Sequence, residues 1–424
     1  MANESGEKGK LGCAIAIVAV LLPLLLAVIM LIVNNKPPSV TIPTHSVPKD
    51  NGWDYFVRAG HMLGMPGPVS STKDEGKWTD ADYEAFMKSN AAALAELRRG
   101  LAKPCVCPPR RDPNGFPEYT HVRELARLLR SEAMYYERKG EYGTAVDSQL
   151  DCLEMGASQP RGGGLIADMV GDAMVAIGSK KIEGNLARLD ASDLAREAEH
   201  IERVRKKIVP YSAVVLEAGL ELASVWIETF CHPETEIRSM MLNPLKWADL
   251  GEAFPGSSTM SGTSNFFTGA RLAFASKTRL VEQMLDYFRA VAVECRKPYT
   301  GTSAVPKPQS PLLDYFLPDI AHQGRRQHLR AETTIALIQT ELALRRFNAD
   351  QKHYPARLDE LIPRYLKAVP IDPFGIGKPL RYKSLNGGKS FLLYSVGGNM
   401  TDDGGKPSPH RGDWTEGDLL LSGT

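Results

Sequence analysis

The chain has 424 residues, of which 43% are apolar and 24% are charged, and its formal net charge is +1. This length is enough for two or three globular domains. The near balance of 51 basic and 50 acidic residues argues against a nucleic-acid-binding protein, which carries a basic excess. It also argues against a long acidic disordered tail.

Residues 11–33, LGCAIAIVAVLLPLLLAVIMLIV, form an apolar run without a single charged side chain. As one helix this run spans roughly 34 Å, which is enough for the hydrocarbon core of a bilayer. A cleaved signal peptide has a shorter apolar region followed by a small-residue cleavage site, and the following NNKPPS does not resemble one. We therefore predict an uncleaved transmembrane helix at 11–33.

Basic residues on the two sides of this run indicate its orientation. Lys8 and Lys10 precede it, whereas Lys36 follows it. This mild bias favours a cytoplasmic N-terminus at 1–10 and an extracytoplasmic location for the rest of the chain. The expected location is the cell membrane, spanned once, with protein partners in the cell envelope and no nucleic acid.

The cysteines follow no metal-binding or disulfide framework. Cys13 lies in the apolar run, Cys105 and Cys107 form one Cys-x-Cys pair, and Cys152, Cys231 and Cys295 stand alone. A structural zinc site needs two such pairs or added histidines at regular spacing. Five cysteines outside the run are an odd number, so at least one is predicted to be a buried free thiol, and a disulfide among the others stays open.

Beyond a proline-rich linker at 34–50, apolar residues recur at helical spacing throughout residues 51–300. We predict an extracytoplasmic helical domain over this range. Thr79 and Asp82 have the spacing of a capping box at the start of one helix. The predicted helices cover residues 51–63, 79–103, 118–139, 142–156, 164–185, 190–208, 212–230 and 278–296.

Two features inside this domain have alternative interpretations. A helix that ends at Gly140, followed by Tyr142 and Ala145, resembles one tetratricopeptide hairpin, but no second copy follows at a 34-residue period, which favours a single helical hairpin. Residues 251–266, GEAFPGSSTMSGTSNF, are predicted to be a mobile loop, with a functional lid as the alternative.

Sequence motifs for catalysis are missing. HExxH, GxSxG, GxxxxGK[ST] and a GxGxxG after a strand do not occur. His121 and Glu124 are three apart on one predicted helix, which is more typical of a solvated helix face than of a metal site. His322 and His328 flank basic residues and are predicted to be exposed.

A linker at 301–324 leads to the last predicted segment, residues 325–424. A long helix is expected over 325–350, followed by short strands in LRYKSL and FLLYSV. The predicted fold is therefore mostly α, with a transmembrane helix, a helical bundle and a small C-terminal α+β module that contains a short antiparallel sheet.

About 95 residues of this tail carry a recognisable order of short motifs. It begins with Tyr354-Pro355 and continues through Asp372-Pro373-Phe374-Gly375 and Leu393-Tyr394-Ser395-Val396-Gly397 to Asp402-Asp403-Gly404-Gly405. This order resembles the C-terminal module of type II secretion pseudopilins, the major pseudopilin especially. The resemblance implies that Tyr382 and Tyr394 sit on paired strands that pack on the long helix.

The same resemblance implies a calcium-binding loop in the tail. The corresponding carboxylates here are Asp402, Asp403, Asp413 and Asp418, and Asn399 stands where the family often has Asp. Calcium takes six to eight oxygen ligands, so the loss of one carboxylate lowers the expected affinity. The alternative is that these acids and glycines merely form a solvated turn.

Two departures argue against a filament subunit. The residues after Gly12 lack the glutamate of pseudopilins, and roughly 290 residues separate the apolar run from the tail. The whole chain resembles uncharacterised bacterial single-pass membrane proteins with a helical ectodomain. We expect a non-enzymatic interaction or scaffold protein of the cell envelope; the alternatives are an envelope hydrolase with a site in the helical domain, or a secretion-system component cleaved after Gly12.

Overall fold

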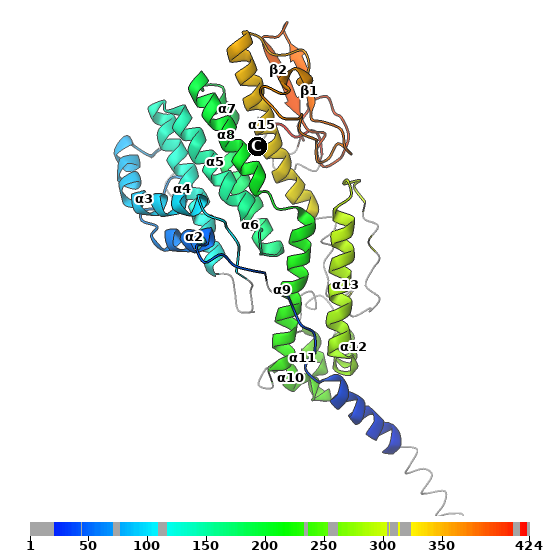
Figure 1. Cartoon of the computed structure of the whole chain (residues 1–424). Coiled ribbons are helices and arrows are strands. Elements are labelled where there is room, and N and C mark those ends of the chain that lie inside the picture. Colours follow the sequence, from blue (N-terminus) through cyan, green and yellow to red (C-terminus); the bar gives the residue numbers. More distant parts are fainter. Residues whose placement is uncertain are drawn as a thin grey trace, which may run out of the picture. The chain divides into compact units, whose positions relative to one another are not determined.

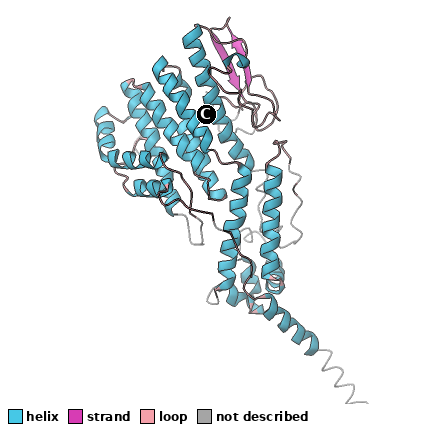
Figure 2. Ribbon diagram, in the orientation of Figure 1, coloured by secondary structure: helices cyan, strands magenta, loops and turns pink. Residues whose placement is uncertain are grey.

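The computed structural model of the chain describes residues 21–43, 45–70, 77–108, 117–232, 236–252, 262–302, 305, 313, 324–409 and 416–421. These residues are mostly helical and contain one two-stranded antiparallel sheet, which confirms the predicted mostly-α class (Figures 1 and 2). Their contacts divide the chain into two compact units. The small unit comprises Met1–Pro43, Leu222–Tyr287 and Pro306–Pro318, and the large unit comprises Thr44–Glu221, Phe288–Val305 and Asp319–Thr424.

The first half of the large unit is a layer of packed helices (Figure 1). Thr79 caps the second of them, and the predicted capping box with Asp82 is present. Gly140 ends a later helix in the left-handed conformation, with φ of 75°, that its lack of a Cβ permits. The helices are α2 (Gly52–His61), α3 (Asp80–Leu101), α4 (Pro117–Lys139), α5 (Tyr142–Ser158), α6 (Leu165–Ser179), α7 (Ile182–Leu186) and α8 (Ala191–Lys207).

Helix α5 lies at the centre of this layer, because it contacts α4, α6 and α8 and buries nearly all of its side chains. Its closest neighbour is α6, where Gly156 and Gly171 face each other. A Cβ added at Gly171 would lie 2.5 Å from the carbonyl oxygen of Gly156. The two glycines therefore let the helix backbones touch, and they fix where α6 runs.

The predicted helix at 164–185 is wrong in one respect, because it is broken in two. Lys181 adopts a left-handed conformation with φ of 61°, and this residue separates α6 from α7. A left-handed residue cannot continue a right-handed helix. The chain turns there and proceeds to α8, which Asp190 caps.

Helix α15 (Arg325–Gln351) is the long helix predicted at 325–350, and it packs against α8 and α6. Its side chains from Thr333 to Leu344 are all buried. The hydroxyl groups of Thr333, Thr334 and Thr340 donate to carbonyls one turn earlier in the same helix, so burying these threonines leaves no donor unsatisfied.

The tail folds onto the far part of α15 (Figure 1). Strands β1 (Arg381–Leu385) and β2 (Ser390–Tyr394) pair antiparallel, so Tyr382 and Tyr394 sit on paired strands as predicted. Before them, the 3-10 helix η5 (Leu358–Leu361) also contacts α15. The chain makes a turn at Asp372, because the N–H of Gly375 donates to its carbonyl at 2.9 Å.

The described residues of the tail share part of their core with the first helices of the large unit. Leu358, Leu380 and Leu393 share one hydrophobic cluster with residues of α5, α8 and α15. The compact units therefore differ from the sequence-based boundaries at 51–300 and 325–424: the large unit joins the first helices to the tail, and residues 222–287 belong to the other unit.

The small unit contains the second part of α9 (Tyr211–Cys231), α10 (Glu236–Met241), η2 (Pro244–Lys246), α11 (Trp247–Glu252), α12 (Gly262–Phe274) and most of α13 (Lys277–Cys295). The loop predicted at 251–266 is shorter than expected, because helices occupy both of its ends. Residues 253–261 lie outside the described residues. Apolar side chains such as Phe266 and Phe274 pack around Trp247, and they explain why the chain stays helical there.

Lys277 closes the end of α12 in this unit. Its ammonium group is buried and donates to the carbonyls of Leu272, Ala273 and Ala275. Burial lowers the pKa of Lys277 to about 7. A cation at the C-terminal end of a helix satisfies the carbonyls that lack intrahelical partners.

The expected transmembrane run at 11–33 is only partly described, from residue 21 onward. There the chain forms an apolar helix, Leu21–Asn34. Across the described part of the chain, no single helix is both long and apolar enough to cross a membrane; α8 and α9 reach the threshold only as a pair, which is bent by 43°.

The cysteines behave as predicted within the described residues. Cys105, Cys107, Cys152, Cys231 and Cys295 are all thiols outside any disulfide, and the first three are buried.

The contact between α5 and α6 gives a first prediction. Gly171→Ala is expected to lower the free energy of unfolding by about 1–3 kcal/mol, because the new methyl group meets a backbone oxygen that cannot move aside. Gly184→Ala in α7 is the matched control, since a Cβ there meets nothing within 4 Å, and it should gain about 0.4–1 kcal/mol. Urea unfolding of the full chain measures both, and equal effects would contradict the close approach.

Candidate functional site

The acids predicted to bind calcium lie beside β2, and the structure describes three of the four. Asp402 accepts hydrogen bonds from the hydroxyl of Tyr394 at 2.8 Å and from Nε of Arg381 at 3.0 Å. The hydrogen bond from Tyr394 is the main reason why the pKa of Asp402 is lowered. Asp403 accepts from the side-chain amide of Asn399 at 2.9 Å.

Asp418 is buried in the same loop, and Asp413 lies outside the described residues. The carboxylate of Asp418 accepts from the backbone N–H groups of Asp403, Gly405 and Lys406, the shortest at 2.6 Å. The structure thus brings Asp402, Asp403 and Asp418 into one loop with their oxygens turned toward protein donors. Calcium binding there stays a prediction.

A more strongly charged cluster lies between α5 and α8, and we call it the His200 cluster: His200, Asp147, Asp151, Glu154 and Glu197. The three acids of α5 are spaced by four and three residues, so they share the helix face that meets α8. Glu197 lies one turn before His200 on α8.

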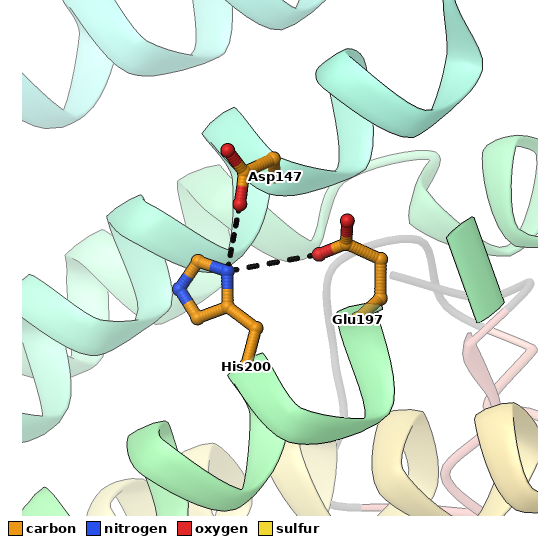
Figure 3. Close-up of side chains that lie close together, drawn as sticks. All are labelled: Asp147, Glu197 and His200. Atoms are coloured by element: carbon orange, nitrogen blue, oxygen red, sulfur yellow. Dashed lines mark hydrogen bonds and ion pairs between the residues drawn. The ribbon is translucent and has the colours of Figure 1, made fainter. Parts of the chain in front are cut away.

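Both ring nitrogens of His200 meet carboxylates. Nδ1 lies 2.9 Å from Oδ1 of Asp147 and 3.6 Å from Oε2 of Glu197 (Figure 3). On the other side of the ring, Nε2 lies 3.0 Å from Oε2 of Glu154 and 3.7 Å from Oδ1 of Asp151. Because a carboxylate accepts hydrogen bonds, both nitrogens must carry protons, and the ring is an imidazolium.

The electrostatics of the ring agree with this assignment. Burial opposes protonation of His200, but hydrogen bonds to Asp147, Glu154 and Glu197 outweigh it and raise its pKa to about 11. Burial also raises the pKa of Asp151 to about 7, although Arg98 and His200 oppose this shift.

Basic side chains outside the ring compensate the remaining acids. Arg98 of α3 donates to Asp151 at 2.9 Å and makes a double hydrogen bond to Glu132 of α4. Lys207 lies 2.6 Å from Glu154, and Arg196 donates to Glu197. The His200 cluster therefore joins four helices, α3, α4, α5 and α8, with nearly balanced charge. Donor atoms of Asp147, Glu197 and His200 lie within 4.8 Å of one another, as do those of Asp151, Glu154 and His200. While both ring nitrogens are protonated, the ring has no lone pair for a metal or a substrate, and its role is to join the helices.

A second cluster lies between α6 and α15, and we call it the His328 cluster: His328, Asp168, Asp172 and Glu332. Each helix supplies two residues one turn apart. Nδ1 of His328 lies 2.7 Å from Oδ1 of Asp168, and Nε2 lies 3.3 Å from Oε1 of Glu332. One donor atom from each of His328, Asp168 and Asp172 lies within 4.8 Å of the other two.

This cluster is less satisfied than the first. His328 is 4% exposed and Asp168 is 2% exposed. Nε2 of His328 and Oδ2 of Asp172 are buried and make no hydrogen bond, although Oε1 of Glu332 lies 3.3 Å from Nε2. Burial opposes protonation of His328, yet Asp168 and Glu332 raise its pKa well above the ordinary value. Burial, and then Asp168, raise the pKa of Asp172.

A cavity of about 330 Å³ opens beside Asp172, between α6 and α15, and we call it the α6–α15 cavity. Most of its wall consists of apolar or small side chains, with Asp172 and Arg330 as the charged groups. Burial lowers the pKa of Arg330, and Asp172 opposes that shift. The lining residues are Met169, Asp172, Ala173, Val175, Ala176, Ser179, Gln327, Arg330, Ala331 and Thr334.

The prediction that His328 is exposed is wrong. Its arginine neighbours at 325, 326 and 330 suggested a solvated face, but α15 is buried on nearly all sides, and the acids of α6 compensate the ring. Sequence reasoning missed both clusters, because their members lie far apart in the chain: Asp168 and His328 are 160 residues apart. The one sign of the His328 cluster in the sequence was the four-residue spacing within two pairs, Asp168 with Asp172 and His328 with Glu332. His322 lies outside the described residues.

Comparison with models of known protein families, with curated proteins and with solved structures finds no match for this chain. The resemblance of the tail to pseudopilins therefore stays a prediction.

The structural role of His200 gives a second prediction. His200→Gln is expected to lower the free energy of unfolding by about 3–5 kcal/mol, because it leaves buried carboxylates without their cation. The exposed pair of His232 and Glu228 supplies the control, since His232→Gln should cost at most about 1 kcal/mol.

The same residue predicts how stability changes with pH. The folded pKa of His200 is about 11, above the usual 6.5, so its contribution is complete below about pH 6.5 and is lost as the pH rises toward 11. Between pH 7 and pH 10 the parent protein should therefore lose more stability than His200→Gln. Urea unfolding at each pH gives the free energy of unfolding of both proteins. If the two values change in parallel with pH, His200 is not charged in the folded state.

Proposed function

We propose that this chain is a membrane-anchored protein of the cell envelope that binds a partner through the α6–α15 cavity and does not catalyse a reaction. The observation that carries the proposal is the cavity itself, which is mostly apolar with a few convergent polar groups. Cavities of this kind are the usual binding sites of proteins.

An exposed apolar stripe leads along α6 to this cavity. Met169 is 64% exposed and Ile166 is 39% exposed, and both lie on the same helix face as Ala173 and Ala176 of the cavity wall. Exposed methionine and isoleucine side chains beside an apolar cavity are typical of an interaction surface. The stripe and cavity together suit an apolar segment of a partner protein.

The alternative of an envelope hydrolase has one observation in its favour, the imidazole of His328 oriented by Asp168. A covalent mechanism also needs a nucleophile that hydrogen-bonds to this base. Two hydroxyl groups line the cavity, those of Ser179 and Thr334, and both donate to carbonyls of their own helices. Binding is therefore the better supported function.

Features of the small unit support the proposed anchor. Leu21 and Leu24 of the apolar N-terminal helix are 58% and 57% exposed, as expected for a segment that lipid would cover. Its end is tied to the unit, because Asn34 donates to the carbonyl of Phe274 at 2.7 Å. In the same unit, Leu245 is 92% exposed and Phe267 is 64% exposed. We propose a cytoplasmic N-terminus and an extracytoplasmic remainder.

The resemblance of the tail to pseudopilins leads to two further tests, one of N-terminal cleavage and one of calcium binding. A secretion-system component would be cleaved after Gly12, and the mass of the N-terminal peptide from native membranes distinguishes this alternative. Calcium binding at Asp402, Asp403, Asp413 and Asp418 would raise the thermal midpoint of the full chain in millimolar calcium relative to chelator. An unchanged midpoint would favour the plain turn.

Partner binding at the cavity gives a direct prediction. A photo-crosslinking residue at position 169, in the full chain in native membranes, should form a discrete adduct with an envelope protein. Ala173→Trp should abolish the adduct, because the indole fills the cavity. Ala92→Trp places the same side chain on an exposed face of α3 and should leave the adduct unchanged.

The thermal midpoint of Ala173→Trp must first match that of the parent, and the smaller Ala173→Leu replaces it if it does not. An adduct that still forms in Ala173→Trp would contradict the proposal. An adduct that is lost equally in Ala92→Trp and Ala173→Trp would also contradict it.

A further inference from the structure

The two histidine clusters differ in the state of the second ring nitrogen. In the His200 cluster each nitrogen has a carboxylate within 3.0 Å, so the ring holds two protons and serves as a cation. In the His328 cluster only Nδ1 has a hydrogen-bond acceptor, which is Asp168. When an ion displaces one proton from the ring, Nε2 can keep its N–H beside Glu332, and Nδ1 then has a lone pair on the side of Asp168.

Carboxylates from two helices lie around the ring of His328. Asp172 stands one turn after Asp168 on α6, and its buried Oδ2 has no hydrogen-bond partner. Glu332 stands one turn after His328 on α15, with Oε1 3.3 Å from Nε2. Donor atoms of His328, Asp168 and Asp172 lie within 4.8 Å of one another, which is a separation that a single ion can bridge.

We propose that the His328 cluster binds one divalent transition-metal ion, with His328, Asp168 and Asp172 as ligands and Glu332 as the carboxylate that orients the imidazole. One imidazole and two carboxylates form a donor set that suits zinc and similar ions. A metal-bound histidine usually presents its other N–H to a carboxylate, and Oε1 of Glu332, 3.3 Å from Nε2, occupies that position.

The charges of the site fit a dication. The charged groups that act on Asp172 are Asp168, His328, Glu332 and Arg330. With the imidazole neutral, three carboxylates and one guanidinium leave a net charge of −2, which one divalent ion neutralises. The ring of Tyr211 packs against His328 with centroids 5.3 Å apart and shields one side of the site.

The α6–α15 cavity supplies a route to the ion. Asp172 belongs to the cavity wall, so an ion held by its carboxylate would sit at the inner end of the cavity. Three protein ligands would leave a coordination position for a donor atom of a bound molecule. The proposed metal site does not rest on partner binding, and either can fail without the other.

Zinc binding by the purified full-length chain tests this inference. The chain is freed of metal with a chelator, titrated with zinc chloride in a calorimeter in the presence of millimolar calcium, and assayed for bound zinc after gel filtration. We expect one equivalent of zinc, which calcium does not displace. Asp172→Asn and His328→Gln should each weaken the binding about tenfold or more.

Asp147→Asn is the matched control, because it changes a carboxylate beside the other histidine, and it should bind zinc as the parent does. Asp172→Asn and His328→Gln must each unfold at the midpoint of the metal-free parent; Glu332→Gln, at a more exposed position of the same cluster, replaces either one if it does not. The spectrum of the cobalt-substituted chain reports the ligands, and nitrogen and oxygen donors without a sulfur band are expected.

Three results would overturn the proposal: a parent chain that retains no zinc, ligand variants that bind as tightly as the parent, or a sulfur-to-cobalt charge-transfer band, which would assign the metal to thiols. Loss of zinc from Asp172→Asn with a preserved crosslink at position 169 would separate this site from partner binding.

Discussion

The charged ring of His200 is the interaction on which the rest of the large unit depends. Its two nitrogens join the acids of α5 to α8, and arginine and lysine side chains from α3 and α8 compensate the acids in turn. A buried ion network of this kind gains little stability over an apolar core of the same shape. Removing one member lowers the free energy of unfolding strongly, however, because its partners stay charged and buried away from water. The network therefore fixes the register of α5 against α8 more than it adds stability.

That register decides where α15 can pack. Helix α8 contacts both α5 and α15, while α6 meets α5 through two facing glycines and meets α15 through the His328 cluster. The α6–α15 cavity is thus framed by elements that a charged ring and a backbone contact hold in place. Rigid neighbours suit a binding site, since little ordering is needed when the ligand arrives. The tail shares the core of α15 and braces the same helix from its far end.

Local patterns in the sequence predicted the secondary structure well. The capping box of Thr79 and Asp82, the helix end at Gly140 and the two paired strands follow from short motifs with a direct physical cause. The break at Lys181 could not be predicted, because nothing in its sequence demands a left-handed residue.

The sites themselves could not be predicted from spacing. Arginines next to His328 suggested exposure, yet acids 160 residues earlier in the chain make its burial tolerable. The tail packs against the first helices through leucines such as Leu358 and Leu393. In the sequence, these leucines are equally consistent with a tail that folds as a separate module. Contacts between residues so far apart in the chain arise from the tertiary structure. The periodicity of apolar residues along one helix does not indicate which distant residues it will contact.

Nuclear magnetic resonance of the imidazole nitrogens tests the central claim most directly. The full chain is labelled with ¹⁵N at its nine histidines, and His200→Gln assigns the signal of interest. At pH 8 both nitrogens of His200 should have the shifts of a doubly protonated ring, because the acids hold its pKa near 11. A neutral ring that titrates between pH 6 and 7 would contradict the account, since the large unit would then lack the charge around which its helices are arranged.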